Sequence, residues 1–210
     1  ERVRRHRLAS ARVATQVWAD RPTLFDFDSQ PTVPFLAIPS VSSETRRYLA
    51  TQRFPADVIA SSLVYTAPDA DGFIFAMVSS AMFMSWQKAV GGRLKSDIRF
   101  SNTLVWNNFP LPAVDQALRT RIAAAGEAVL AARDQHPERT LAKHYNASHM
   151  DPDLYKAHAE LDALVDKAFG ARGRQSDAGR QTLLFNSYAD LVGADQLVPQ
   201  ENSRPARRRS

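Results

Sequence analysis

The sequence predicts an α+β protein, in which a first part with short strands around one helix is followed by a part made of amphipathic helices. Between residues 33 and 112, short apolar and β-branched runs alternate with segments rich in proline, serine and aspartate. From Pro112 onward, apolar residues recur every three or four positions, which is the spacing of helices that bury one face. We therefore expect a small mixed or antiparallel-strand domain followed by a helical bundle.

The strands of the first part are predicted from apolar runs between turn residues. Residues 1–19 are expected to form a helical segment before them. The run Phe35 to Ile38 lies between two prolines and predicts a buried strand. The runs Val58 to Tyr65 and Phe73 to Val78 flank the turn residues 68–72, so an antiparallel hairpin is expected there.

One helix is predicted in this part, from Met82 to Val90, because its apolar residues recur at helical spacing. Ser79 and Ser80 precede it and are suitable N-cap residues. Gly91 and Gly92 follow it and are expected to end it with a positive φ. A further strand is predicted at Thr103 to Trp106.

The stretch after this helix is expected to be extended, so that its side chains alternate. Arg93, Lys95, Asp97 and Arg99 would then form one row of long polar side chains. Arginine and lysine donate to guanine, whereas aspartate accepts from cytosine, so this mixture suits DNA base edges. The alternative is an ordinary solvated strand edge with surface ion pairs.

The helical part is predicted to contain three helices with one apolar face each. The first covers Val114 to Leu130. The second begins at Asp151, a capping residue followed by a first-turn proline, and the third begins after Ser176. No catalytic side chains cluster on these helices, so we expect a packing domain.

Composition excludes several classes of protein. The chain has 210 residues, of which 44% are hydrophobic and 9% aromatic, as in globular proteins with a real core. It has no cysteine, which excludes disulfides and cysteine zinc sites and fits a reducing, cytoplasmic compartment. No apolar run approaches the roughly 20 residues of a membrane span, and no signal peptide is visible. Because the chain begins at Glu1, we expect it to be part of a longer protein.

The positive charge is concentrated at the two ends. The formal net charge is +5, but arginines of residues 1–19 and of residues 201–210 account for it, and the body between them is slightly negative. Residues 195–210 are expected to be a basic, disordered tail. A local excess of positive charge remains between Lys88 and Arg99, and local charge is what a polyanion experiences.

Motifs for catalysis or metal binding are scarce. His144 and His149 are the nearest histidines to each other, and no third ligand converges on them in the sequence. No glycine-rich phosphate loop and no nucleophile elbow is present. Asn107 to Pro110 have the wrong order for the catalytic loop of amino-methyltransferases. We therefore predict no catalytic residue and no metal site in this chain.

Several segments match a known family in order and spacing. They are Phe35 to Arg46 with Tyr48, Val58 to Ser62, Pro68 to Ala70, Ser79 to Trp86, Val90 to Thr103 and Asn107 to Pro112, followed by Tyr145, Asp151 to Leu154 and Lys156 to Asp162. Together they resemble the carboxy-terminal part of MmeI-like, type IIL restriction-modification proteins. The resemblance implies four parts: a linker from a missing catalytic part at residues 1–19, a DNA target recognition domain at residues 20–112, a helical domain at residues 113–194 and a tail at residues 195–210.

The resemblance also implies a function and partners. The parent protein would be similar to a DNA adenine N6 methyltransferase, often fused to a nuclease, with S-adenosylmethionine bound in the missing part and no cofactor in this fragment. The partners would be double-stranded DNA and the upstream methyltransferase domain. The fragment itself would recognise a DNA sequence without being an enzyme.

Residue roles follow from the same resemblance. Lys95 and Asp97 would choose one base pair together, with lysine donating to guanine and aspartate accepting from the paired cytosine. Arg99 would read another base. Further residues that would read bases are Glu44, Ser62 and Leu63. The residues that would contact the DNA backbone are Arg93, Lys88, Arg46 and Arg47.

Two alternatives belong to other classes. The chain could be a helical protein-interaction module without DNA binding, which predicts a large exposed apolar patch on the helices. It could also be a hydrolase whose site no motif reveals. The DNA hypothesis instead requires the base-reading candidates to come together on one face.

Overall fold

The structure, a computed structural model, describes residues 1–23 and 31–193. They fall into two compact units, one within residues 1–30 and the other within residues 31–210. The predicted tail, residues 195–210, lies outside the described residues. Within the two described ranges, no helix has the length and apolar character that crossing a membrane demands.

The first unit contains two short helices where the sequence predicted one helical segment. They are α1 (Arg2–Leu8) and α2 (Val13–Val17). The hydroxyl of Ser10, between them, accepts a hydrogen bond from the amide two residues later at 3.2 Å, and local side-chain bonds of this kind compete with helical pairing. Arg7 holds the unit together by donating to two main-chain carbonyls beyond α2, at 2.7 and 2.8 Å.

The second unit contains two small antiparallel sheets. The first has the order β3-β1-β4, with β1 (Phe35–Pro39) in the centre and β3 (Gln52–Phe54) and β4 (Val64–Pro68) at its edges. The central strand is almost entirely buried, as the proline-bounded apolar run predicted. The register aligns Ala37 with Gln52 on one side and with Thr66 on the other.

The second sheet has the order β2-β6-β5, formed by β2 (Val41–Ser42), β6 (Asp97–Arg99) and β5 (Gly92–Leu94). Ser40 joins the two sheets. Its amide donates to the carbonyl of Leu63 at 3.0 Å, and its carbonyl accepts from the amide of Phe100 at 2.9 Å. The chain therefore passes from one sheet to the other at a single residue.

The predicted hairpin between residues 58 and 78 is wrong, because Phe73–Val78 form helix α3. Buried Asp69 accepts hydrogen bonds from the amides of Ile74 and Phe75, at 3.2 and 3.1 Å, so it satisfies donors that a helix start leaves free. A short apolar run fits a buried helix as well as a strand. All of α3 but Ile74 is buried, so no polar face marks its helical period.

Helix α4 (Ala81–Val90) confirms the predicted helix, and Ser80 caps it by accepting from the amide of Phe83 at 3.2 Å. The positive φ predicted for the glycine that ends this helix is wrong, because Gly91 has a φ of −72°. A β-carbon at this position would lie 2.4 Å from the carbonyl oxygen of Gln87. Gly91 is therefore required by a close approach of the chain and not by a left-handed conformation.

The predicted strand at residues 103–106 is also wrong, because Asn102–Trp106 form a short π-helical turn, η1. Ser101 caps this turn by accepting from the amide of Leu104 at 3.2 Å. The indole of Trp86 in α4 donates to the carbonyl of Val105 at 2.9 Å. This tertiary bond uses a carbonyl that a sheet would have paired within its ladder.

As far as residue 193, the helical part contains four helices, one more than predicted: α5 (Gln116–Asp134), α6 (Leu141–His144), α7 (Pro152–Ala168) and α8 (Asp177–Val192). The predicted cap residues Asp151 and Ser176 accept hydrogen bonds from amides at the starts of α7 and α8. The α+β class, with helices at the carboxy-terminal end, is therefore confirmed.

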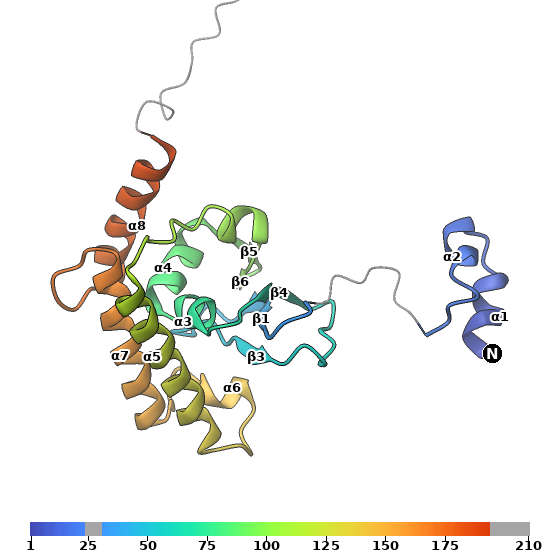
Figure 1. The fold of residues 1–210 in the computed structure, drawn as a ribbon, viewed down its shortest axis with the longest axis horizontal. Helices are drawn as coiled ribbons and strands as arrows, with labels where there is room; N and C mark the ends of the chain where they lie inside the picture. Colours follow the sequence, from blue (N-terminus) through green and yellow to red (C-terminus); the bar gives the residue numbers. More distant parts are fainter. Residues whose placement is uncertain (24–30, 194–210) are drawn as a thin grey trace, which may run out of the picture. The chain divides into compact units, whose positions relative to one another are not determined.

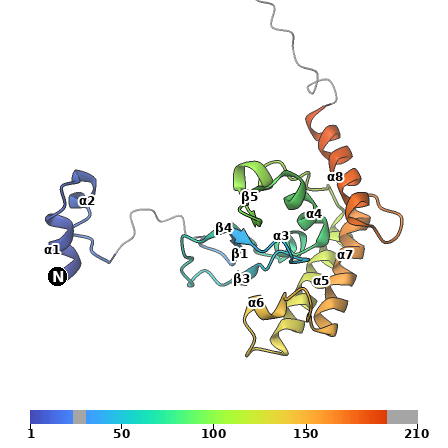
Figure 2. The same cartoon turned by 180° about the vertical axis from the view of Figure 1, so that it is seen from behind.

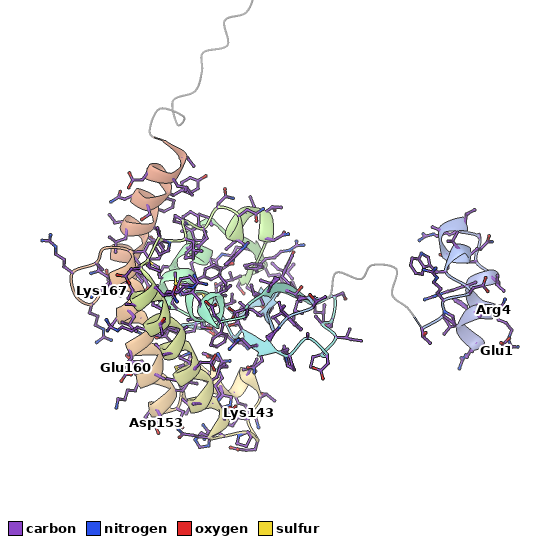
Figure 3. The ribbon with its side chains drawn as sticks, viewed as in Figure 1. Glu1, Arg4, Lys143, Asp153, Glu160 and Lys167 are labelled. Carbon is purple, nitrogen blue, oxygen red and sulfur yellow. The ribbon has the colours of Figure 1, made fainter. Side chains whose placement is uncertain are left out.

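These helices pack on the first part as well as on one another. Helix α5 packs against α7 and α3, and α8 packs against α4. Figures 1 and 2 show α3 and α4 between the strands and the long helices. Gly126 in α5 permits this packing, because a β-carbon there would lie 2.8 Å from the β-carbon of Ala76. Residues such as Asp153, Glu160 and Lys167 lie on the outer side of α7 (Figure 3).

A buried polar network crosses the junction between the two parts. Asp162 of α7 accepts from the hydroxyl of Tyr48 at 2.9 Å and from the amide of Ala81 at 2.8 Å. Burial raises the pKa of the Asp162 carboxyl and the pKa of the Tyr48 phenol. The ring of His158 stacks on the ring of Tyr48, with centroids 3.9 Å apart.

Arg133 extends this network from α5. Its guanidinium donates to the hydroxyl of Tyr145 at 2.9 Å and to the carbonyl of Thr51 at 2.7 Å. Because the Tyr145 oxygen accepts from two nitrogens of the Arg133 guanidinium, its own proton is directed to Nε2 of His158, 2.8 Å away. Burial, followed by the charges of Arg133 and Arg47, lowers the pKa of His158 well below its usual value. His158 is therefore a neutral acceptor at the centre of the junction.

Candidate nucleic-acid interface

The Lys95 segment forms a tight hairpin and not the predicted extended row. Strand β5 pairs with β6 so that Arg93 lies opposite Ile98 and Leu94 lies opposite Asp97. This register leaves Lys95 and Ser96 as a two-residue turn. Lys95 has a φ of 58° and is the one residue other than glycine with a positive φ in the described ranges. Backbone strain of this kind is often found at functional sites.

The hairpin register divides the candidate residues between two faces. Residues directly opposite each other in a ladder point to the same side. Ile98 is 1% exposed, so its face, shared with Arg93, is the one directed at the core. Asp97 and Arg99 belong to the other face, which is directed at solvent. The prediction that Arg93 shares a row with Asp97 and Arg99 is therefore wrong, because the chain reverses at the turn.

Two apolar residues lie on the solvent-directed face and were missed in the sequence. Val41 pairs with Arg99, and Leu94 pairs with Asp97, so all four share this face. Val41 is 36% exposed and Leu94 is 51% exposed. Had the turn at Lys95 been recognised, the alternation of side chains along each strand would have placed Leu94 on the same face as Asp97. The turn contains no glycine, asparagine or proline to reveal it.

Glu44 lies next to this hairpin, in the turn that follows β2. Its carboxylate is 3.9 Å from the guanidinium of Arg93, and both side chains are about half exposed. The turn is closed by a bond from the amide of Arg46 to the carbonyl of Ser43 at 3.2 Å. An exposed pair at this distance contributes little stability, so both side chains stay free to be recruited by a ligand.

Ser62 and Leu63 reach the same region from the turn before β4. The carbonyl of Leu63 accepts from Ser40, the residue immediately before β2. The side chain of Leu63 is 73% exposed. Three segments far apart in the sequence therefore meet around β2: the Glu44 turn, the Ser62 turn and the Lys95 hairpin. The Ser62 turn thus lies beside the start of β2 and Glu44 lies just beyond its end, while Asp97 and Arg99 belong to β6, the strand that pairs with β2.

Helix α4 fixes the hairpin from behind. The buried amide of Gln87 donates to the carbonyl of Arg99 at 3.1 Å. Gly91 lets the chain leave α4 directly over Gln87. The hairpin is therefore attached to a rigid element, as precise positioning of a binding residue requires.

The candidates for the DNA backbone are less closely grouped. Lys88 lies in the last turn of α4 and is half-buried, as is Arg46. Arg47 lies instead against α7, where its guanidinium carbon is 5.1 Å from the ring centroid of Tyr155. It also donates to the Tyr155 hydroxyl at 3.4 Å.

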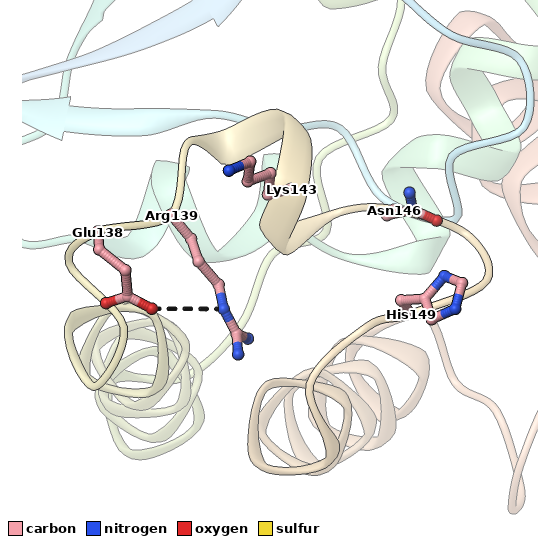
Figure 4. Close-up of a pocket in the computed structure, with 5 residues that line it drawn as sticks. All are labelled: Glu138, Arg139, Lys143, Asn146 and His149. Atoms are coloured by element: carbon pink, nitrogen blue, oxygen red, sulfur yellow. Dashed lines mark ion pairs between the residues drawn. The ribbon is translucent and has the colours of Figure 1, made fainter.

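A hollow of about 440 Å³ lies elsewhere, beside α6, and contains none of the predicted site residues. Its lining includes Glu138, Arg139, Lys143, Asn146 and His149 (Figure 4). Arg139 is paired there with Glu138 at 3.6 Å. Among the residues that the structure describes, no group of three or more histidine and acidic side chains is arranged to hold a metal ion.

Comparisons with known proteins identify the family of this chain. The family model for the MmeI target recognition domain matches residues 1–113, and the model for the MmeI C-terminal domain matches residues 114–195. DNA methyltransferase A of Bacillus subtilis (strain 168) is 36% identical over 189 residues, which are 89% of this chain and 21% of that protein. The chain therefore spans about a fifth of the length of this relative.

A solved structure is similar over nearly the whole chain. It is the type IIL restriction-modification enzyme MmeI in complex with DNA, with a TM-score of 0.80 and 36% identity, covering 90% of this chain and 25% of that one.

Proposed function

Given that this chain belongs to the MmeI family, whose target recognition and C-terminal domains match its residues 1–195, we propose that it recognises a specific sequence in double-stranded DNA. The observation that carries this proposal is the meeting of the Glu44 turn, the Ser62 turn and the Lys95 hairpin around β2. A β-ribbon of this size fits the major groove. The similarity to a structure of MmeI in complex with DNA supports the same function.

The solvent-directed face of the hairpin offers two kinds of contact. Asp97 and Arg99 provide an acceptor and donors for base edges, whereas Leu94 and Val41 provide apolar contact for the methyl group of thymine. Lys95, in the two-residue turn of the hairpin, is exposed. We infer that Lys95 and Asp97 choose one base pair together and that Arg99 reads a second one. Glu44, Ser62 and Leu63 complete the base-reading set.

Phosphate contacts would come from positive side chains near this face. Lys88 in α4 and Arg46 in the Glu44 turn lie on segments that adjoin the hairpin, whereas Arg93 lies in β5 itself, on the face opposite Asp97 and Arg99. Such contacts position the protein and make binding depend on salt, but they carry no sequence information.

We infer that the parent protein supplies the chemistry. It would be a DNA adenine N6 methyltransferase that binds S-adenosylmethionine in an upstream domain, works in the cytoplasm and is joined to a nuclease. The similarity to DNA methyltransferase A, of which this chain covers a fifth, supports that proposal. The chain would dock on DNA and place the target adenine near the upstream domain.

An exchange of charges tests the base-reading assignment. In the parent protein, Lys95→Glu combined with Asp97→Lys is expected to change one base pair of the sequence that becomes methylated. Lys156→Glu combined with Glu160→Lys on the exposed side of α7 is the matched control, because it makes the same exchange away from the hairpin. Methylated sites are mapped by sequencing. An unchanged target in the hairpin variant removes both residues from the base-reading set.

A further inference from the structure

Arg47 and Arg174 converge on one phenol oxygen, although they are distant in the sequence. Arg47 follows the Glu44 turn, and Arg174 lies in the loop between α7 and α8. Each donates to the hydroxyl of Tyr155 at 3.4 Å. In the described part of the chain, neither guanidinium forms an ion pair with a carboxylate. Two cations held this close without an anion repel each other.

A cavity of about 460 Å³ opens beside this pair. Arg47, Lys167 and Arg174 bring three positive charges to its lining, and Arg180, Asp162 and Asp166 also line it. The charges of Arg180, Asp162 and Asp166 are already paired or hydrogen-bonded within the protein. Asp166 forms a two-point pair with Arg180 at 2.8 and 2.9 Å, and both carboxylate oxygens of Asp162 accept within the buried network. The charge left facing the cavity is therefore positive.

The tyrosine between the arginines reports the same positive field. The charge of Arg47, followed by the bonds from Arg174 and Arg47, lowers the pKa of the Tyr155 phenol. The ring of Tyr155 also supports Arg47 by a cation–π contact at 5.1 Å. Arg47 is thus oriented before any ligand arrives, which lowers the entropy that binding would cost.

We propose that Arg47, Lys167 and Arg174 form an oxyanion site that binds a phosphate group. The planar guanidinium suits a phosphate because it donates two parallel hydrogen bonds. The site is built from both family domains, because Arg47 belongs to the first and Lys167 and Arg174 belong to the second. The phosphate is either a backbone phosphate of duplex DNA or a free phosphate group, and these two sources are separated by experiment.

The test uses Arg174→Gln and, as its matched control, Arg172→Gln. Both residues are exposed in the same loop and both changes remove one positive charge, but only Arg174 lines the cavity. Binding of inorganic phosphate to the 210-residue chain is titrated by calorimetry at constant ionic strength. Arg174→Gln is expected to weaken binding by about tenfold or more, the effect of one hydrogen bond to a charged group. Arg172→Gln is expected to bind like the parent chain.

A second titration uses duplex DNA over a range of salt concentrations. If the phosphate belongs to DNA, Arg174→Gln weakens duplex binding and reduces the slope of log affinity against log salt by about 0.9 more than Arg172→Gln does. If the phosphate is free, only the phosphate titration changes. Equal behaviour of the two variants in both titrations overturns the site. Since inorganic phosphate is measured separately, a chain that fails to bind any duplex contradicts the proposed function without deciding this inference.

Discussion

Replacing Lys95 with glycine should separate DNA recognition from stability. A residue other than glycine at a φ of 58° carries roughly 1–2 kcal/mol of strain. Glycine removes that strain but adds about 0.5–1 kcal/mol of chain entropy in the unfolded state. The free energy of unfolding is therefore expected to stay the same or to rise by up to about 1.5 kcal/mol. Duplex binding should lose roughly 1–3 kcal/mol, the value of one good base contact, which is about a 5- to 150-fold weaker affinity.

The control is Ser96→Gly in the same turn. Ser96 does not have a positive φ, so this change relieves no strain and is expected to lower stability by about 0.5–1 kcal/mol while leaving duplex affinity nearly unchanged. Unfolding is followed in urea by circular dichroism, and affinity is measured on duplexes that contain the methylated target. If Lys95→Gly is destabilising and binds its target as tightly as the parent chain, the assignment of Lys95 to base reading is refuted.

Three further predictions test the structure that supports this site. Tyr145→Phe removes the acceptor of a buried guanidinium and should lower the free energy of unfolding by about 2–4 kcal/mol, whereas Tyr155→Phe, with its long and exposed bonds, should cost less than about 1 kcal/mol. Gly91→Ala should be destabilising and should weaken duplex binding, because its methyl group meets the Gln87 carbonyl; a normal urea midpoint would contradict the close approach. The fold lowers the pKa of His158 below its value of about 6.5 in the unfolded chain. The free energy of unfolding is therefore expected to fall as the pH drops below about 6.5, by up to about 1.4 kcal/mol per pH unit. If His158→Gln leaves this pH dependence unchanged, the histidine is not the buried neutral group described above.

Local chemistry made parts of the fold predictable. Asp151 and Ser176 have short polar side chains that satisfy free amides at helix starts, so the beginnings of α7 and α8 could be read directly. The strand at Phe35 was equally clear, because a proline on each side isolates its apolar run. These signals act over a few residues and do not depend on distant partners.

The errors come from positions where tertiary contacts decide. Phe73–Val78 have no polar face, so strand and helix had equal local support, and Asp69 decided between them by binding the amides of the first turn. The π-helical turn at residues 102–106 is likewise fixed by a bond from Trp86. Neither outcome follows from the apolar spacing of the segment itself.

The candidate site was predicted as a set of residues but not as a surface. The sequence supplied Lys95, Asp97 and Arg99, but Ser96 and Asp97 are weaker turn signals than glycine or proline, so the reversal between the first two residues was missed. That reversal turned Arg93 away from the row and placed Leu94 opposite Asp97. The pairing of β2 with β6 placed Val41 opposite Arg99. The resemblance to a family named the positions, and only the register showed which of them share a face.

The packing of α5 and α8 onto α3 and α4 has a practical consequence for the transfer of this DNA recognition domain to another protein. Cutting the chain after residue 112 would expose the apolar helices α3 and α4 to solvent. It would also remove Asp162, the carboxylate that accepts the hydrogen bond of Tyr48. Specificity is therefore better exchanged one side chain at a time on the β5–β6 hairpin, or by moving residues 31–193 as a single cassette, than by swapping the first domain alone.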